Sequence, residues 1–146
     1  MNSCKIRYAS INDIDSIFSI DNSYEFEKYS YNQFLEMYNI DYYHFLVAMS
    51  DTKIVGYLCF TKIFDECNLI KIVVSKEFQH QGIGKNLVEF LIHEMKVSGV
   101  KKIYLEVRTD NEKAINLYEK TGFKLIDIRK GYYNGIDAKI YGIDLC

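Results

Sequence analysis

The sequence predicts an α/β or α+β fold, a mixed sheet of about seven strands with helices on both faces. Short apolar or alternating segments typical of strands recur among amphipathic segments of helical spacing along the whole chain. One apolar run, Leu69–Val74, passes through a glycine-containing segment directly into a helical pattern, Lys85–Val97. With 146 residues, 49% of them hydrophobic, the chain is long enough for one domain, residues 1–146, around one real core.

The first half of the chain begins with a strand and two helices. Lys5–Tyr8 alternates like a strand, and Ser10–Asp13 has the form of a capping box with Asp in place of Glu. Apolar residues at helical spacing, Ile14, Ile17 and Phe18, follow it. A second short helix is predicted at Tyr31–Tyr38. Three strands are then predicted, at residues 44–49, 54–62 and 68–74, with polar turns at 50–53 and 65–66.

The second half alternates helices and strands. The helix at 85–97 carries an apolar stripe and ends at Gly99. A strand at 102–107 places Glu106 on its polar face, because Ile103, Leu105 and Val107 point the other way. Residues 109–112 have capping-box form and open a helix that ends at Gly122. Two closing strands, 124–128 and 138–145, lie on either side of a turn region at 132–135.

Charge and cysteine content argue against several classes of function. A net charge of −2 and a pI near 5.9 do not suit bulk nucleic-acid binding. We see no secretory signal and no apolar run of about 18 residues, so we expect a cytoplasmic protein without a membrane partner. The cysteines, Cys4, Cys59, Cys67 and Cys146, have no CxxC spacing and no accompanying histidine cluster, so we expect reduced thiols and no metal. Cys59 and Cys67 are expected in the core.

The segment Gln79–Gly84 is the strongest functional signal. It joins a strand to a helix, so unpaired N–H groups and the positive end of the helix dipole form a site for phosphate. The segment lacks a Walker A ending and the three-glycine dinucleotide spacing, and a diphosphate-bearing acyl carrier such as coenzyme A fits better. Residues 76–146 carry 12 Lys and Arg against 10 Asp and Glu, whereas residues 1–75 carry 6 against 10. This imbalance suits a polyanionic cofactor near the loop, and chance explains it equally well.

The loop, the later strand and the last helix together resemble the GNAT family of acetyl-CoA-dependent N-acetyltransferases. The family's acyl-CoA signature, Gln/Arg-x-x-Gly-x-Gly/Ala, fits Gln79–Gly84. The RimI branch is the most similar, through Leu105–Arg108, Asn111, Ala114–Phe123, Arg129–Tyr133 and Asp137-Ala138. The resemblance covers residues 69–145 well and the first 65 residues only loosely. It implies the GNAT fold, acetyl-CoA as co-substrate and, for that branch, acetylation of the N-terminal alanine of a small-subunit ribosomal protein.

The resemblance also implies roles for individual residues. Glu106 matches the general base, Tyr118 the general acid, and Asn111 a residue that contacts the cofactor. The backbone of Ile72, Val73 and Val74 would pair with the pantetheine arm, as a peptide adds to a sheet edge. The loop would hold the pyrophosphate, which gives the further cofactor-binding set Gln79, His80, Gln81, Gly82, Ile83, Gly84 and Lys85.

Each assigned residue also has a purely structural interpretation. A carboxylate at Glu106 can accept an amine proton, or it can form a surface ion pair with Arg108 or with a lysine on the next strand. Tyr118 lies on the apolar stripe of its helix, and glycines in a strand-to-helix turn can serve backbone geometry alone. His80 and His93 are alternative candidates for the base, but we expect His80 to contact phosphate or solvent in the loop and His93 to be a solvated residue on its helix. No cysteine or serine is a convincing nucleophile, so we expect direct transfer in a ternary complex.

The acceptor amine is the least determined feature. An α-amine has a pKa of about 8 and a lysine about 10.4, a difference worth ~3 kcal/mol of easier deprotonation, which suits a single carboxylate base. RimI-like enzymes usually carry a Phe-Pro-Trp element after the first helix, whereas residues 23–31 here contain aromatic residues but neither proline nor tryptophan. We predict a peptide or ribosomal-protein N-terminus as the acceptor and a monomer or weak dimer. A small amine (polyamine or antibiotic), a protein lysine and a catalytically silent acyl-CoA sensor are the alternatives.

Overall fold

The computed structural model describes residues 4–145, so the expectation of a reduced thiol at Cys146 lies outside the described residues. Within this range the chain forms seven strands and four α-helices. Their bounds are β1 Lys5–Tyr8, α1 Ile14–Asp21, α2 Tyr31–Tyr38, β2 Tyr43–Ser50, β3 Lys53–Ile63, β4 Glu66–Val74, α3 Ile83–Val97, β5 Lys102–Arg108, α4 Glu112–Lys120, β6 Lys124–Tyr133 and β7 Ile136–Asp144. Two 3-10 turns, η1 Ile11–Asp13 and η2 Lys76–Phe78, precede α1 and the loop before α3.

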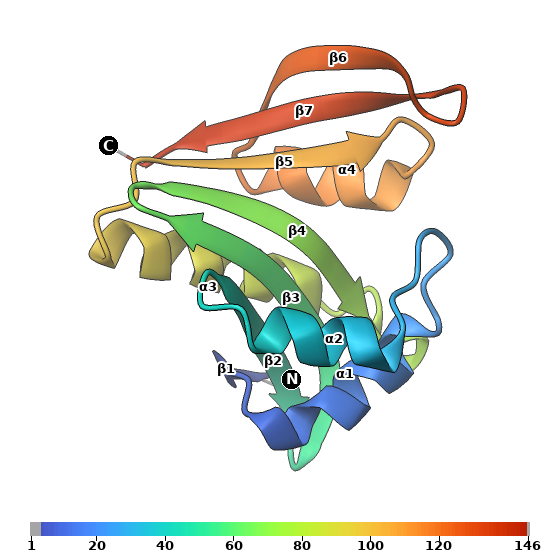
Figure 1. Ribbon diagram of the computed structural model, residues 1–146, viewed down its shortest axis with the longest axis vertical. Helices are drawn as coiled ribbons and strands as arrows, with labels where there is room; N and C mark the ends of the chain where they lie inside the picture. Colours follow the sequence, from blue (N-terminus) through green and yellow to red (C-terminus); the bar gives the residue numbers. More distant parts are fainter. Residues whose placement is uncertain (1–3, 146) are drawn as a thin grey trace.

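The strands of residues 4–145 form one mixed sheet in the order β1-β2-β3-β4-β5-β7-β6. Neighbouring strands are antiparallel except for β4 and β5, which are parallel. Figure 1 shows α1 and α2 in front of the sheet and α3 behind it. The predicted fold class is confirmed, a mixed sheet with helices on both faces.

An apolar cluster fills each side of the sheet. On one side, Leu87 and Leu91 from α3 pack with Ile115 from α4 against the strands. On the other side, Ile17 from α1 and Phe34 from α2 do the same. The helical spacing of apolar residues therefore indicated the buried stripes correctly. Cys67 lies in the first cluster and Cys59 in the second, as expected for core residues.

The sheet opens between its two central strands. In residues 4–145 the β4–β5 ladder has three pairs, from Glu66 opposite Lys102 to Asn68 opposite Tyr104. Beyond them the strands diverge, as Figure 1 shows for the green and orange arrows. The β5-facing edge of β4 after Asn68 is therefore left without a neighbouring strand of the described chain.

A β-bulge lies in β4 where it leaves β5. Cys59 on β3 is opposite Lys71, whereas the next residue, Phe60, is opposite Leu69, so Ile70 is an extra residue. A bulge changes which face the following side chains point to. Leu69 packs in the α3-side cluster, but Val73 packs in the α1-side cluster. As a result, Lys71 faces α1.

The start of α4 differs from the prediction. The capping-box assignment at Thr109 is wrong, because the Thr109 N–H donates to the Asp137 carbonyl at 3.0 Å and so prolongs the β5–β7 ladder. The N-cap is Asn111, whose side-chain oxygen accepts from the Ala114 N–H at 3.3 Å.

The last hairpin is longer than predicted. β6 continues past Ile128 to Tyr133, because its ladder with β7 resumes at Tyr133 opposite Ile136 after an irregular stretch. The turn itself consists of Asn134 and Gly135, both with positive φ, 48° and 95°. That pairing is typical of a tight hairpin turn.

Candidate active site

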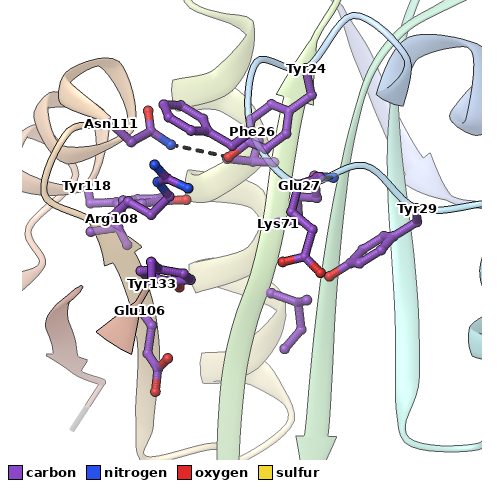
Figure 2. Close-up of a pocket in the computed structure, with 13 residues that line it drawn as sticks. Tyr24, Phe26, Glu27, Tyr29, Lys71, Glu106, Arg108, Asn111, Tyr118 and Tyr133 are labelled. Atoms are coloured by element: carbon purple, nitrogen blue, oxygen red, sulfur yellow. Dashed lines mark hydrogen bonds between the residues drawn. The ribbon is translucent and has the colours of Figure 1, made fainter. Parts of the chain in front are cut away.

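A cavity of about 150 Å³ lies in the gap between β4 and β5. Its walls come from these strands, the start of α4, the segment between α1 and α2, and the β6–β7 hairpin (Figure 2). The predicted site residues Ile72, Glu106, Asn111 and Tyr118 all line it. The cavity is therefore the candidate place for the reacting groups.

Glu106 lies on β5 with its carboxylate on the exposed face of the strand. Its Oε1 is 3.4 Å from Nη1 of Arg129 on β6. The alternative of an ion pair was therefore right in kind, but the partner is Arg129. Arg108 instead makes two hydrogen bonds to Asp110, at 3.0 and 2.9 Å. A pair that is 34% and 53% exposed leaves the carboxylate partly open to solvent, and Glu106 is one of the residues that line the cavity.

Tyr118 is both a core residue and a wall of the cavity. It is 5% exposed and its ring lies 5.9 Å from that of Phe123. Burial raises the pKa of Tyr118, and the nearby phenols of Tyr24 and Tyr133 act in the same direction. The hydroxyl is therefore a neutral donor at physiological pH, next to the cavity that Glu106 also lines.

The glycine segment has the backbone form that the sequence predicted. His80 and Gly82 have φ of 65° and 81°, so the chain turns sharply before α3. The first intrahelical bond runs from the Asn86 N–H to the Gly82 carbonyl at 3.0 Å, and no side chain of residues 4–145 caps the turn. The backbone N–H groups before Asn86, including those of Ile83 and Lys85, make no intrahelical hydrogen bond and are therefore available to an anion.

Several predicted loop residues have structural roles as well. The Gln79 side-chain amide donates to the Val74 carbonyl at 3.1 Å and so ties the loop to the end of β4. A Cβ at Gly84 would lie 3.2 Å from the Leu117 side chain, so a glycine lets α3 and α4 pack closely. The Ile83 side chain is buried, which leaves only its backbone for a ligand, whereas His80, Gln81 and Lys85 are exposed.

Asn111 joins two parts of the molecule. Its Nδ2 donates to the Tyr24 hydroxyl at 3.2 Å, across the gap from α4 to the segment after α1 (Figure 2). The Arg108 guanidinium crosses the same gap, 4.9 Å from the Phe26 ring and 5.7 Å from the Tyr133 ring. The segment between α1 and α2, which carries Tyr24 and Phe26, therefore forms one wall of the cavity.

Sequence reasoning missed a buried ion pair beside the cavity. Lys71 Nζ is 2.7 Å from Oδ1 of Asp21, and these side chains are 6% and 0% exposed. Two features of the sequence could have indicated this pair. Lys71 is a charged residue inside the apolar run of β4, and Asp21 lies on the same helical face as Ile14 and Ile17 of α1. The bulge that turns Lys71 toward α1 carries no such signal.

The remaining candidate side chains do not extend the site. His93 is exposed on α3, as expected. Burial raises the pKa of the Cys59 and Cys67 thiols, the latter to about 12, so neither is an activated nucleophile. Residues 4–145 contain no cluster of three or more His, Cys, Asp or Glu side chains arranged for a metal ion. Over the same range, no helix has the length and apolar character needed to cross a membrane.

Comparison with known proteins places the chain in a family. Residues 11–123 match the model of the acetyltransferase (GNAT) family. The chain therefore belongs to that family of acetyl-CoA-dependent N-acetyltransferases, as its motifs predicted.

The predicted similarity to the RimI branch is confirmed as well. The [ribosomal protein bS18]-alanine N-acetyltransferase of Escherichia coli is 39% identical over 87 residues, which are 60% of this chain and 59% of that protein, so the match spans less than two thirds of its length. An N-alpha-acetyltransferase of Saccharolobus solfataricus is 36% identical over 147 aligned positions, 91% of this chain and 88% of that protein. The crystal structure of the ribosomal-protein-S18-alanine N-acetyltransferase from Escherichia coli superposes with a TM-score of 0.90 at 29% identity, covering 98% of this chain and 94% of that one.

Proposed function

We propose that the protein, as one domain, transfers the acetyl group of acetyl-CoA to the N-terminal α-amine of a protein, with an N-terminal alanine of a ribosomal protein as the first candidate. One observation carries the proposal: a carboxylate, Glu106, and a buried neutral phenol, Tyr118, line the same small cavity at the split of the sheet. The similarity to N-terminal acetyltransferases that cover most of this chain supports the choice of acceptor.

Glu106 is proposed as the general base. The acceptor nitrogen must lose a proton as it attacks, and a carboxylate accepts it directly or through one water. Its ion pair with Arg129 is long and partly exposed, so the carboxylate keeps free acceptor capacity. A modest base of this kind suits an α-amine better than a lysine, because the α-amine is far more often neutral near pH 7.

Tyr118 is proposed as the general acid. Burial keeps its phenol protonated, so it has a proton to donate when a thiolate leaves. A thiol has a pKa of about 8.5 and an ordinary phenol about 10, and burial raises the pKa of Tyr118 further, so the transfer is unfavourable on pKa alone and depends on good placement. Tyr118 is fixed for this purpose by its packing in the core.

Acetyl-CoA supplies the acyl thioester, and the described residues fit it in two places. The free β4 edge along Ile72, Val73 and Val74 is the proposed place for an extended amide arm; the Val74 carbonyl already accepts from the Gln79 side chain, so the arm would use the remaining edge groups or displace that amide. The uncapped start of α3, from Gln79 to Lys85, offers N–H groups for a pyrophosphate. Asn111 lines the cavity and is the proposed side-chain contact to the cofactor there.

Two matched peptides test the proposal through release of CoA from acetyl-CoA. One offers a free N-terminal alanine and no lysine, and the other is blocked at its N-terminus and contains one lysine. Turnover of the first alone is the expected result. Turnover of the second alone contradicts the α-amine assignment. Spermidine is assayed beside the peptides, and its turnover alone favours a small-amine enzyme. Binding of acetyl-CoA without turnover of any amine would indicate a sensor.

A further inference from the structure

The buried pair Asp21–Lys71 is surrounded by donors and acceptors that satisfy it. Asp21 Oδ1 also accepts from the Tyr57 hydroxyl at 2.6 Å, and its Oδ2 accepts from the Tyr29 N–H at 2.8 Å. Lys71 donates to the Glu27 carbonyl, and its Nζ lies 4.4 Å from the ring centres of both Tyr24 and Tyr29. Figure 2 shows Lys71 close to Tyr24, Glu27 and Tyr29 of the segment between α1 and α2.

Stability alone does not explain why the pair Asp21–Lys71 is buried. Moving two charges out of water costs free energy that their attraction only partly returns, and apolar replacements of buried pairs are often neutral or stabilising. Burial accordingly lowers the pKa of Lys71 despite the adjacent carboxylate. The network therefore needs an explanation other than stability.

The contacts of the pair concentrate on one irregular segment. Residues 24–30 form neither helix nor strand. The pair holds this segment by the Glu27 carbonyl, the Tyr29 N–H and the rings of Tyr24 and Tyr29. Tyr24 in turn is fixed from α4 by Asn111. An irregular segment that forms a cavity wall needs such anchors, because backbone hydrogen bonding does not fix its path.

We propose that Asp21 and Lys71 are positioning residues for the acceptor: their buried ion pair anchors the irregular segment of residues 24–30 as the acceptor-side wall of the cavity. The proposal rests on the proposed function for its kinetic consequence, but the anchoring itself does not depend on it. A wall displaced by about 1 Å lowers the efficiency of a positioned reaction by up to about 10²-fold.

Three variants separate positioning from folding. Lys71→Met removes the cation and leaves a buried carboxylate, so it also destabilises the fold. The double variant Asp21→Asn with Lys71→Met leaves no unpaired buried charge, so its thermal midpoint lies well above that of Lys71→Met alone. Lys102→Met is the matched control, since Lys102 also contacts a carboxylate, Asp144, and a tyrosine ring, but on β5 at the far end from the cavity mouth.

The kinetic readout uses the alanine peptide. In the double variant we expect the peptide KM to rise and kcat/KM to fall about tenfold or more, while the Kd for acetyl-CoA stays within a factor of two of wild type. The control variant keeps wild-type values. A purely structural role predicts the opposite pattern, an unchanged KM with kcat lowered in proportion to the folded fraction. An unchanged peptide KM in a folded double variant overturns the proposal.

A second readout is independent of activity. Lys28 lies exposed in the anchored segment and is a trypsin site. We expect native-state cleavage after Lys28 to be about tenfold faster in the double variant than in wild type or in Lys102→Met, since cleavage follows local opening. If wild type acetylates no peptide, the proposed function fails while this contrast still decides the anchoring. Equal cleavage rates overturn it, and faster cleavage with an unchanged KM overturns the role in acceptor positioning.

Discussion

Replacing Glu106 by Gln is expected to separate turnover from folding. The pair with Arg129 is partly exposed, with its closest charged atoms 3.4 Å apart. A pair of this kind contributes about 0–1 kcal/mol to stability, so the midpoint of thermal unfolding shifts by only a few degrees. Loss of a general base instead lowers kcat by about 10²–10⁴-fold. The two effects differ enough in size to be assigned without ambiguity.

The assay follows CoA thiol release at saturating acetyl-CoA over a range of pH, with calorimetric measurement of the acetyl-CoA Kd. The Kd is expected to stay near wild type, because Glu106 is not part of the α3 N-terminus or the β4 edge. Arg129→Gln is the matched control, since it removes the same ion pair but keeps the carboxylate, and it should retain turnover. A Glu106→Gln variant that keeps wild-type kcat across pH would refute the base assignment.

Three further changes give distinct results. Tyr118→Phe keeps the ring in the core and removes only the hydroxyl, so kcat should fall on the order of 10²-fold with little change in the melting temperature; unchanged kcat would exclude the acid role. Gly84→Ala places a methyl group 3.2 Å from a leucine side chain on α4, but the family signature also accepts alanine there and alanine favours a helix over glycine by ~1 kcal/mol, so stability and the acetyl-CoA Kd measured by calorimetry should both stay near wild type; a large loss of either would contradict this. Asp13→Asn removes the carboxylate that accepts from the Ser10 N–H and both terminal nitrogens of Arg7, at an expected cost of about 1–2 kcal/mol at pH 7. The hydrogen bonds from Arg7 lower the pKa of Asp13. The Asp13 carboxylate therefore contributes its full stability above the ordinary carboxyl pKa, and this contribution is lost as pH falls through the folded-state pKa. The urea unfolding curves of wild type and Asp13→Asn should converge in acid, and a difference that stays constant with pH would contradict this.

Local patterns predicted the regular elements of this chain well. The predicted bounds of β1 and α2 agree with the structure, because both elements depend on a few neighbouring residues: β1 on alternation, and α2 on a capping box that Ser30 and Gln33 form in the structure. The predicted end of β6 was wrong, because its last pairs depend on β7 and on an irregular stretch between them. Strand length there is a property of the partner, which local patterns do not describe.

The candidate site was predictable where its features depend on neighbouring residues in the sequence. The turn within Gln79–Gly84 and the polar face that carries Glu106 follow from local spacing, whereas the positive φ of His80 in place of Gly84 was not predicted. The orientation of Lys71 does not, because the bulge at Ile70 exists only through the pairing of β3 with β4. The choice of Arg129 as the partner of Glu106 likewise required the positions of β5, β7 and β6 in the sheet.

The most direct test of an α-amine acetyltransferase is a single peptide that offers both kinds of amine. It begins with a free alanine and contains one internal lysine, and the products are fragmented by tandem mass spectrometry after incubation with acetyl-CoA. Because both amines are present at the same concentration, the site of acetylation reports preference directly. The account predicts that the acetyl group is on the N-terminal nitrogen; an acetyl group on the lysine side chain would contradict it.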